Sequence, residues 1–316
     1  MRVKDILKIA VAEGINADPR TEKEIKRILQ RNKRQYEKLS GVKKQTYDLH
    51  MLESPYADTR IIYGKDNEVD QIWVGIDVDT SELNMIKNVS SDANALVLSH
   101  HPMGRAYASF YEVMDMQTDI LIQQGLTDSI AQSLTDKRKK EVARKVSPSN
   151  HFKASDAANI LQIPTMCIHT PADNHVKQYL DSIFKNKTPY FLKDIIDILM
   201  EIPEYFDAAL KGAPPLILSG RKNNRCGKIF VDMTGGTEGS PDLIDKLVSS
   251  GVSTVICMHM SEKHYKNAEK SSLNVIVAGH ISSDNLGLNL LIDKILKKLG
   301  DIKIFEFSGF KRVSRI

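Results

Sequence analysis

Histidine side chains follow four apolar segments of this sequence, and imidazole is the commonest metal ligand among protein side chains. The segments end at His100–His101, at His169, at His259 and at His280. Short apolar runs bounded by polar residues are typical of buried β-strands. In α/β proteins the loops that leave the carboxyl ends of the strands converge on one crevice. The pattern therefore predicts that these strand ends meet around metal.

The first histidine pair is followed directly by proline, in the order His100-His101-Pro102. Adjacent residues of a regular strand point to opposite faces, so both imidazoles can reach one site only if the strand has already ended. Pro102 favours an extended conformation at His101 and disfavours a helix there. These three residues are therefore consistent with a fixed loop that carries two ligands. The alternative of one buried, hydrogen-bonded histidine and one surface histidine stays open for this motif alone.

Two of the histidines are followed by an aspartate four residues later, in the pairs His169/Asp173 and His280/Asp284. Positions i and i+4 lie on one face of a helical turn, so His280 and Asp284 could bind the same ion at a helix start. Asp173 could supply an oxygen ligand and bridge two cations. The alternatives are local roles, as a turn or N-cap residue for Asp173 and as a favourable N-terminal helix charge for Asp284.

Taken together, the candidates provide at least three imidazoles and two carboxylates beside predicted strand ends. This set suits a pair of divalent ions better than a structural zinc site, which would use thiolates. Two ions about 3.5–4 Å apart activate water and neutralise a phosphoryl or carbonyl oxygen, so the chemistry indicated is hydrolysis. Zn, Mn, Fe and Co all suit such ligands, and the sequence does not select among them.

Further polar residues near the last two strand ends are candidates for roles beside the metal. His259, Glu262 and His264 could orient the ligands or contact substrate, although a surface position is the favoured interpretation for Glu262 and His264. The glycine-rich turn Gly235–Gly239 precedes a predicted helix, where backbone N–H groups can bind phosphate. It lacks the Gly-Lys-Ser/Thr ending of a P-loop, so we favour a tight strand-to-helix turn.

The composition is that of a globular protein that stays out of membranes. The chain has 316 residues, 41% of them hydrophobic, and a formal charge of +4 that is too small to indicate nucleic-acid binding by itself. For the basic N-terminal helix we favour a solvated face or a subunit contact over a nucleic-acid surface. No signal peptide and no apolar run of about 18 residues is present. Three widely spaced cysteines without a CxxC motif indicate buried thiols in a reducing compartment, the cytoplasm.

The chain is predicted to form an α/β fold of two similar βα-rich lobes with the metal site between them, plus a helical N-terminal arm. Asp79 and Glu82 have the spacing of a helix capping box, and the strands on either side of that helix form a βαβ unit. Residues 216–218 and 228–231 flank a polar turn and predict a β-hairpin. The expected boundaries are an arm at 1–55, a first lobe at 56–180 with a helical insertion near 106–160, a helical connector and hairpin at 181–225, and a second lobe at 226–316.

The order of these motifs resembles the NIF-three-like dinuclear metal-binding proteins, a family also described as a second type of GTP cyclohydrolase I. The resemblance covers roughly residues 56–175 and 226–299. It implies two α/β lobes with metals between them, a ring-shaped homohexamer and a small-molecule substrate that could be a nucleotide. The ligands that it implies for two divalent ions are His100, His101, Asp173, His280 and Asp284.

The sequence departs from this family at two positions of the site. The last ligand is usually glutamate, and Asp284 is one methylene shorter. The family usually has Gly-Glu where this chain has Met258-His259, so His259 could add a ligand or replace an acid/base group. The preferred hypothesis is a metal-dependent hydrolase in which His259 or Glu262 acts as the catalytic acid/base. The alternative is a metal-binding assembly or regulatory protein without turnover.

Overall fold

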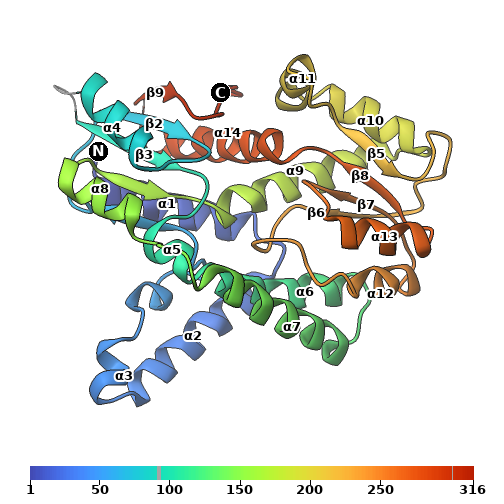
Figure 1. Ribbon diagram of the computed structural model, residues 1–316, viewed down its shortest axis with the longest axis horizontal. Coiled ribbons are helices and arrows are strands. Elements are labelled where there is room, and N and C mark those ends of the chain that lie inside the picture. The colour runs from blue at the N-terminus through green and yellow to red at the C-terminus, as the bar shows by residue number, and fades with distance from the viewer. Residues whose placement is uncertain (91–93, 301) are drawn as a thin grey trace.

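The computed structural model describes residues 1–90, 94–300 and 302–316, and it contains two mixed β-sheets separated by two long helices (Figure 1). The first sheet has the order β1-β4-β3-β2-β9 and the second has the order β5-β8-β7-β6. The predicted α/β class with two lobes and a helical arm is confirmed. The strands are β1 (Arg60–Tyr63), β2 (Gln71–Gly75), β3 (Ala95–Ser99), β4 (Thr165–Cys167), β5 (Leu216–Ser219), β6 (Lys228–Asp232), β7 (Val252–Cys257), β8 (Asn274–Val277) and β9 (Lys303–Glu306).

The two sheets repeat one topology. In each sheet three consecutive strands are parallel, and the strand that precedes them pairs antiparallel with the last of the three. The helix after that last strand is α9 (Thr170–Lys187) in one lobe and α14 (His280–Leu299) in the other. These equivalent helices therefore begin at equivalent sheet edges, directly after β4 and β8.

The β-hairpin predicted for residues 216–218 and 228–231 is wrong. Strands β5 and β6 do form at the expected places, but they lie at opposite edges of the second sheet, and β5 pairs with β8. The polar turn between β5 and β6 marks only the point at which the chain reverses. Pairing along the sheet is decided by how β7 and β8 fill the two central positions, which no local turn signal encodes.

Two segments cross between the lobes, which corrects the predicted boundaries. Strand β9 pairs in parallel with β2 of the first sheet, although residues 226–316 were expected to form the second lobe. Within the helical insertion, α6 (Met116–Gln123) and α7 (Asp128–Val146) contribute to the core under the second sheet, where Ile120 and Leu121 share one apolar cluster with Phe230. Figure 1 shows α6 and α7 beside α12 (Leu243–Ser249).

The remaining helices pack against the faces of the two sheets or against the long central helices. The capping box predicted from Asp79 and Glu82 is confirmed at the start of the helix between β2 and β3. Pro203 ends the preceding helical run and occupies the first turn of the next helix, as its missing N–H requires. These helices are α4 (Thr80–Val89), α5 (Gly104–Ala108), α8 (Lys153–Leu161), α10 (Leu192–Met200), α11 (Pro203–Leu210) and α13 (Glu262–Lys270).

The N-terminal arm divides into a buried helix and an exposed extension. Helix α1 (Val3–Asn16) packs on α9 and α14, so it belongs to the core. Helices α2 (Glu22–Lys38) and α3 (Gly41–Gln45) extend from the body and are mostly exposed, as their basic sequence predicts (Figure 1). All three cysteines are buried and free, as predicted for the thiols themselves. None of the helices in the described ranges has the length and apolarity needed to cross a membrane.

Glycines permit the close helix contacts at the centre of the molecule. Helix α1 continues past Gly14 to Asn16, and a Cβ atom at Gly14 would lie 2.6 Å from the Cβ atom of Pro171. A Cβ atom at Gly287 of α14 would lie 2.5 Å from the backbone oxygen of Ala172. Both contacts involve the first turn of α9, so the position of that turn depends on these two glycines.

Gly14→Ala is predicted to destabilise the fold, against the usual effect of this substitution in a helix. Alanine normally stabilises a helix interior by up to about 1 kcal/mol over glycine. Here the added methyl group would displace a proline ring and backbone, and such overpacking costs about 1–3 kcal/mol. Urea unfolding of both proteins measures the difference. An unchanged or higher free energy of unfolding in the variant would contradict the contact.

His175 is predicted to make the metal-free protein less stable in mild acid. Burial lowers the pKa of this imidazole to about 4, and its Nδ1 atom donates a hydrogen bond to the backbone oxygen of Pro171. The stability that the neutral ring provides is present above the unfolded pKa of about 6.5. It is lost as the pH falls toward 4, by about 3 kcal/mol in total. The His175→Asn variant cannot gain this proton. After chelator treatment it should therefore lose less stability than the wild type between pH 6.5 and 4. Parallel curves of unfolding free energy against pH for the two proteins would contradict the prediction.

Candidate metal centre

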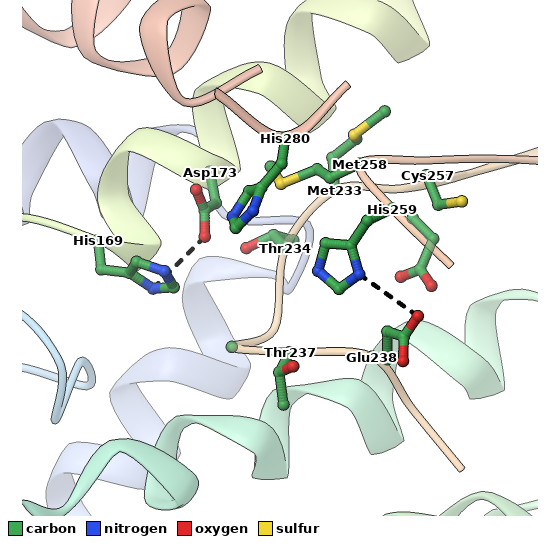
Figure 2. A pocket seen from close by; sticks show the side chains of 12 residues that line it. His169, Asp173, Met233, Thr234, Thr237, Glu238, Cys257, Met258, His259 and His280 are labelled. Atoms are coloured by element: carbon green, nitrogen blue, oxygen red, sulfur yellow. Dashed lines mark ion pairs between the residues drawn. The ribbon is translucent and has the colours of Figure 1, made fainter. Parts of the chain in front are cut away.

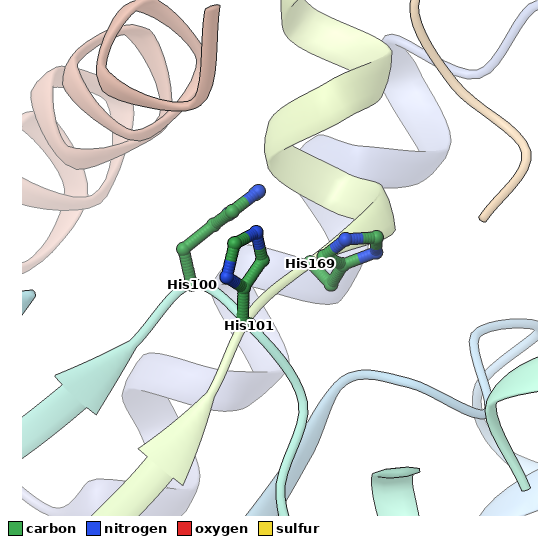
Figure 3. A group of neighbouring side chains, drawn as sticks. All are labelled: His100, His101 and His169. Atoms are coloured by element: carbon green, nitrogen blue, oxygen red, sulfur yellow. The ribbon is translucent and has the colours of Figure 1, made fainter. Parts of the chain in front are cut away.

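The carboxyl ends of the parallel strands meet where α9 and α14 begin. The histidine pair follows β3, whose five residues are all buried, and the strand ends at Ser99 before the pair. His169 precedes the first residue of α9, and His280 is the first residue of α14. Figure 3 shows His100, His101 and His169 grouped beyond the ends of β3 and β4. The ring centroids of His100 and His169 are 4.8 Å apart, and those of His101 and His280 are 5.2 Å apart.

Asp284 occupies the centre of this group. Its Oδ1 atom lies 3.4 Å from Nε2 of His100, and its Oδ2 atom lies 3.5 Å from Nε2 of His101 and 3.6 Å from Nε2 of His280. Asp173 approaches from the first turn of α9, with its Oδ1 atom 3.4 Å from Nε2 of His100. The structure thus brings together all five side chains that the family resemblance implies as ligands.

These donors form two groups of three that share Asp284. One group is His100, Asp173 and Asp284, and the other is His101, His280 and Asp284; in each group one donor atom from every residue lies within 4.8 Å of the others. A third group combines the histidine pair with His169. Imidazole nitrogens with carboxylate oxygens are a ligand set that suits divalent transition metals. The cluster could therefore hold metal ions.

Several polar atoms of the cluster are buried without a hydrogen-bond partner among the described residues. They are Nε2 of His100, Oδ1 of Asp173 and both carboxylate oxygens of Asp284. Buried polar atoms are nearly always paired, because an unpaired one costs about 1–3 kcal/mol. Four such atoms that face one another fit bound cations, which would satisfy them together.

The charges in the cluster are strongly coupled in the absence of a cation. Burial by itself would lower the pKa of His100, but the carboxylates of Asp284 and Asp173 more than offset this and raise it to about 10. Burial would likewise raise the pKa of Asp284, but the imidazole of His100 and its neighbours hold it far below the ordinary value. The site therefore attracts positive charge, which protons or metal ions can provide.

Hydrogen bonds on the opposite ring nitrogens orient the imidazoles. Nδ1 of His100 lies 3.1 Å from the backbone oxygen of Ile168, and Nδ1 of His101 lies 2.7 Å from a carboxylate oxygen of Asp77. Nδ1 of His169 lies 2.9 Å from the buried carboxylate of Asp58. With a proton on each Nδ1 atom, Nε2 is free to bind metal, which is the usual arrangement of a ligating histidine.

The second lobe forms the opposite wall of the site. A cavity of about 60 Å³ has His169, Asp173 and His280 on one side and residues of the glycine-rich turn on the other. Figure 2 shows His259 beside this turn, paired with Glu238. Nδ1 of His259 lies 3.4 Å from Oε1 of Glu238, and the rings of His259 and His280 have centroids 5.0 Å apart. The nearby carboxylate of Glu238 raises the pKa of His259.

Comparison with solved structures identifies the architecture. The model superposes on the crystal structure of an NIF3 superfamily protein from Sphaerobacter thermophilus with a TM-score of 0.70 and 24% sequence identity, covering 80% of this chain and 92% of the other. The chain has a NIF3-like fold. The family resemblance predicted from the motifs is thereby confirmed for the fold. No protein-family model and no curated protein matches this sequence.

Other solved structures align less closely with this chain. Reduced HcgD from Methanocaldococcus jannaschii has a TM-score of 0.48 and 14% identity, with 77% of this chain and 84% of that chain covered. A Bacillus cereus protein related to NIF3 has a TM-score of 0.42 and 11% identity, with 91% of this chain and 98% of that chain covered.

Two residues suggested near the site have other roles in this NIF3-like structure. Glu262 lies outside the cavity, where it is exposed at the start of α13 and pairs with Lys266. His264 is buried rather than on the surface, and its two ring nitrogens contact Oγ of Ser261 and the backbone oxygen of Gly239. The sequence interpretation missed Glu238. This residue follows the end of β6, so the strand-end rule that found the histidines could have found it as well.

The glycine-rich turn does not lead directly into a helix, because α12 begins only at Leu243. Gly235 and Gly236 have φ values of +104° and +90°, a conformation that other residues rarely adopt. The amide nitrogen of the buried Gln117 side chain donates hydrogen bonds to the backbone oxygens of Gly235 and Thr237. The insertion helix α6 thus holds the turn that carries Glu238.

Metal analysis of three variants is predicted to separate the two donor groups. Asp284→Asn should lose both ions, because both groups use this carboxylate, while Asp173→Ala should lose one. Elemental analysis after reconstitution measures the ions per chain. Asp293→Asn is the matched control, since Asp293 is a buried aspartate of the same helix that pairs with Arg312 instead. Full metal content in Asp284→Asn would contradict a shared ligand.

Proposed function

We propose that this protein is a dinuclear metal-dependent hydrolase that acts on a nucleotide or phosphoester-like substrate. The observation that carries the proposal is the position of Asp284, whose buried Oδ1 atom faces His100 while its buried Oδ2 atom faces His101 and His280. One ion is assigned to His100 and Asp173 and the other to His101 and His280, with Asp284 shared. Zn, Mn, Fe and Co remain the candidate metals.

Paired divalent ions supply activated water and neutralise charge that develops on a substrate oxygen. The chain itself supplies the walls and the proton carriers. The first lobe supplies His100, His101 and Asp173, and Nδ1 partners orient the two imidazoles. Helix α14 of the second lobe supplies His280 and Asp284. The second lobe places His259 across the cavity from Asp173. We assign the catalytic acid/base role to His259, which Glu238 orients, rather than to Glu262.

The size of the cavity restricts the part of the substrate that enters it. A volume of about 60 Å³ accepts a phosphoryl-sized group but not a whole nucleotide. A larger pocket of about 390 Å³ includes His101 in its wall, together with Asp77 and Tyr107. In this proposal the reacting group lies in the small cavity and the remainder of the substrate extends outside it. GTP ring opening is one version, and it rests on the family resemblance.

The small cavity also favours a second candidate function. A protein that binds metal without turnover needs no substrate pocket beside the ions, and 60 Å³ would then hold only water. In this alternative the protein is a metal-binding assembly or regulatory component, with the exposed arm helix α2 available for contacts. For either function we propose a homo-oligomer, a hexamer by resemblance, in a reducing compartment such as the cytoplasm, where the free thiols are stable.

Hydrolysis by the reconstituted protein is predicted to depend on metal and on His259. Release of phosphate or formate from a panel of nucleotides and phosphoesters measures turnover. His101→Ala should abolish it with loss of metal, whereas His259→Gln should lower kcat by about 10²-fold and retain metal, because acid/base catalysis contributes about 10²–10⁴-fold. Glu238→Gln should lower kcat less.

Glu262→Gln is the matched control for these variants, since Glu262 is an exposed neighbour of His259 outside the cavity. Its activity should equal that of the wild type. A protein with two ions per chain and no turnover on any substrate would overturn the hydrolase assignment and favour the alternative. Full activity in His259→Gln would instead remove His259 from the mechanism.

A further inference from the structure

Asn174 adjoins the candidate ligand Asp173 and is fully buried in the first turn of α9. It was not singled out from the sequence. Its side chain nevertheless makes hydrogen bonds to the N-terminal arm and to the second lobe. It is therefore a point at which three parts of the chain meet beside the site.

The amide nitrogen of Asn174 faces the arm. It lies 3.1 Å from the backbone oxygen of Gly14, 3.3 Å from the hydroxyl of Tyr56 and 3.4 Å from a carboxylate oxygen of Asp18. Its amide oxygen faces the other lobe and accepts a 2.7 Å hydrogen bond from the hydroxyl of Thr234. Thr234 lies in the wall of the small cavity, next to the glycine-rich turn.

The arm side of this network is itself fixed by a buried ion pair. Arg20 donates two hydrogen bonds to the carboxylate of Asp18, at 2.9 and 2.8 Å, and both side chains are almost completely inaccessible. The hydroxyl of Tyr56 donates to the same carboxylate at 2.8 Å. Buried polar networks with every member satisfied are rigid, because any displacement leaves a costly unpaired group. Asp18 therefore gives Asn174 a rigid anchor at the junction of α1 and α2.

We propose that Asn174 is a positioning residue of the metal centre, which holds the first turn of α9, and with it Asp173, at a set distance from the second-lobe wall. The inference rests on the proposed function, since it concerns the ion assigned to His100, Asp173 and Asp284. The other ion uses His101, His280 and Asp284, none of which lies on α9. Loss of Asn174 therefore affects the two ions unequally.

If Asn174 had only a structural role, its loss would lower the stability of the whole protein and would not weaken one ion more than the other. Asn32 of α2 offers the matched comparison, because it is a buried asparagine whose amide nitrogen donates to the backbone oxygen of Met51 within the arm. Asn32→Ala removes a buried hydrogen bond far from the cluster. Thr234→Val is a milder second variant. It keeps the shape of the side chain and removes only the hydroxyl group that donates a hydrogen bond to Asn174.

The experiment is a titration of chelator-treated, full-length protein with Zn²⁺ against a chromophoric competitor. The wild type, Asn174→Ala, Thr234→Val and Asn32→Ala are compared. Removal of a residue that orients a metal ligand typically weakens affinity about 10–100-fold. We expect this loss for one of the two ions in Asn174→Ala, a smaller loss for the same ion in Thr234→Val, and wild-type affinities in Asn32→Ala.

The Asp173→Ala background assigns the affected ion. Asp173→Ala retains one ion, and adding Asn174→Ala to it should leave the affinity for that remaining ion unchanged. Equal weakening of both ions, or equal behaviour of Asn174→Ala and Asn32→Ala, would overturn the positioning role while the dinuclear site stands. Binding of fewer than two Zn²⁺ ions by the wild type would instead overturn the proposed function and this inference with it.

Discussion

The structure depends on keeping one buried carboxylate, that of Asp284, among three imidazoles. An isolated charge in a protein interior is strongly unfavourable, so it must be balanced by opposite charge or by metal. His100, His101 and His280 surround the two oxygens of Asp284 at 3.4–3.6 Å, a distance longer than a good hydrogen bond. The imidazoles can balance the charge, but they leave both oxygens without a good hydrogen bond. A bound cation would supply the missing interaction.

The repeated topology of the two lobes explains how such a site arises. Each lobe places a His-x-x-x-Asp segment at the start of the helix that follows its last parallel strand, at His169/Asp173 and at His280/Asp284. Because α9 and α14 pack directly on each other, both segments face one space. Gly287 allows the close approach of the two helices. The middle parallel strand ends differently in the two lobes, since β3 leads to His100 and His101 whereas β7 leads to His259.

The lobes also share segments, so neither is an independent unit. Strand β9 returns to the first sheet, and helix α6 from the first half of the chain holds the glycine-rich turn of the second. Hydrogen bonds from Gln117 of α6 to the glycine-rich turn, and from Thr234 to Asn174, connect the two walls of the cavity. The junction between the lobes therefore fixes the geometry of the donor cluster.

The sequence alone determined the local features of this protein. Apolar runs that end in histidine predicted the strand ends, Asp79 and Glu82 predicted a helix cap, and the i, i+4 spacing of His280 and Asp284 predicted that they share a face. These inferences succeed because each depends on neighbouring residues. Tertiary structure alone decided that β5 pairs with β8, that Gly14 contacts Pro171, and that Glu238 rather than Glu262 meets His259. Such choices depend on contacts between distant segments, whose geometry no local pattern specifies.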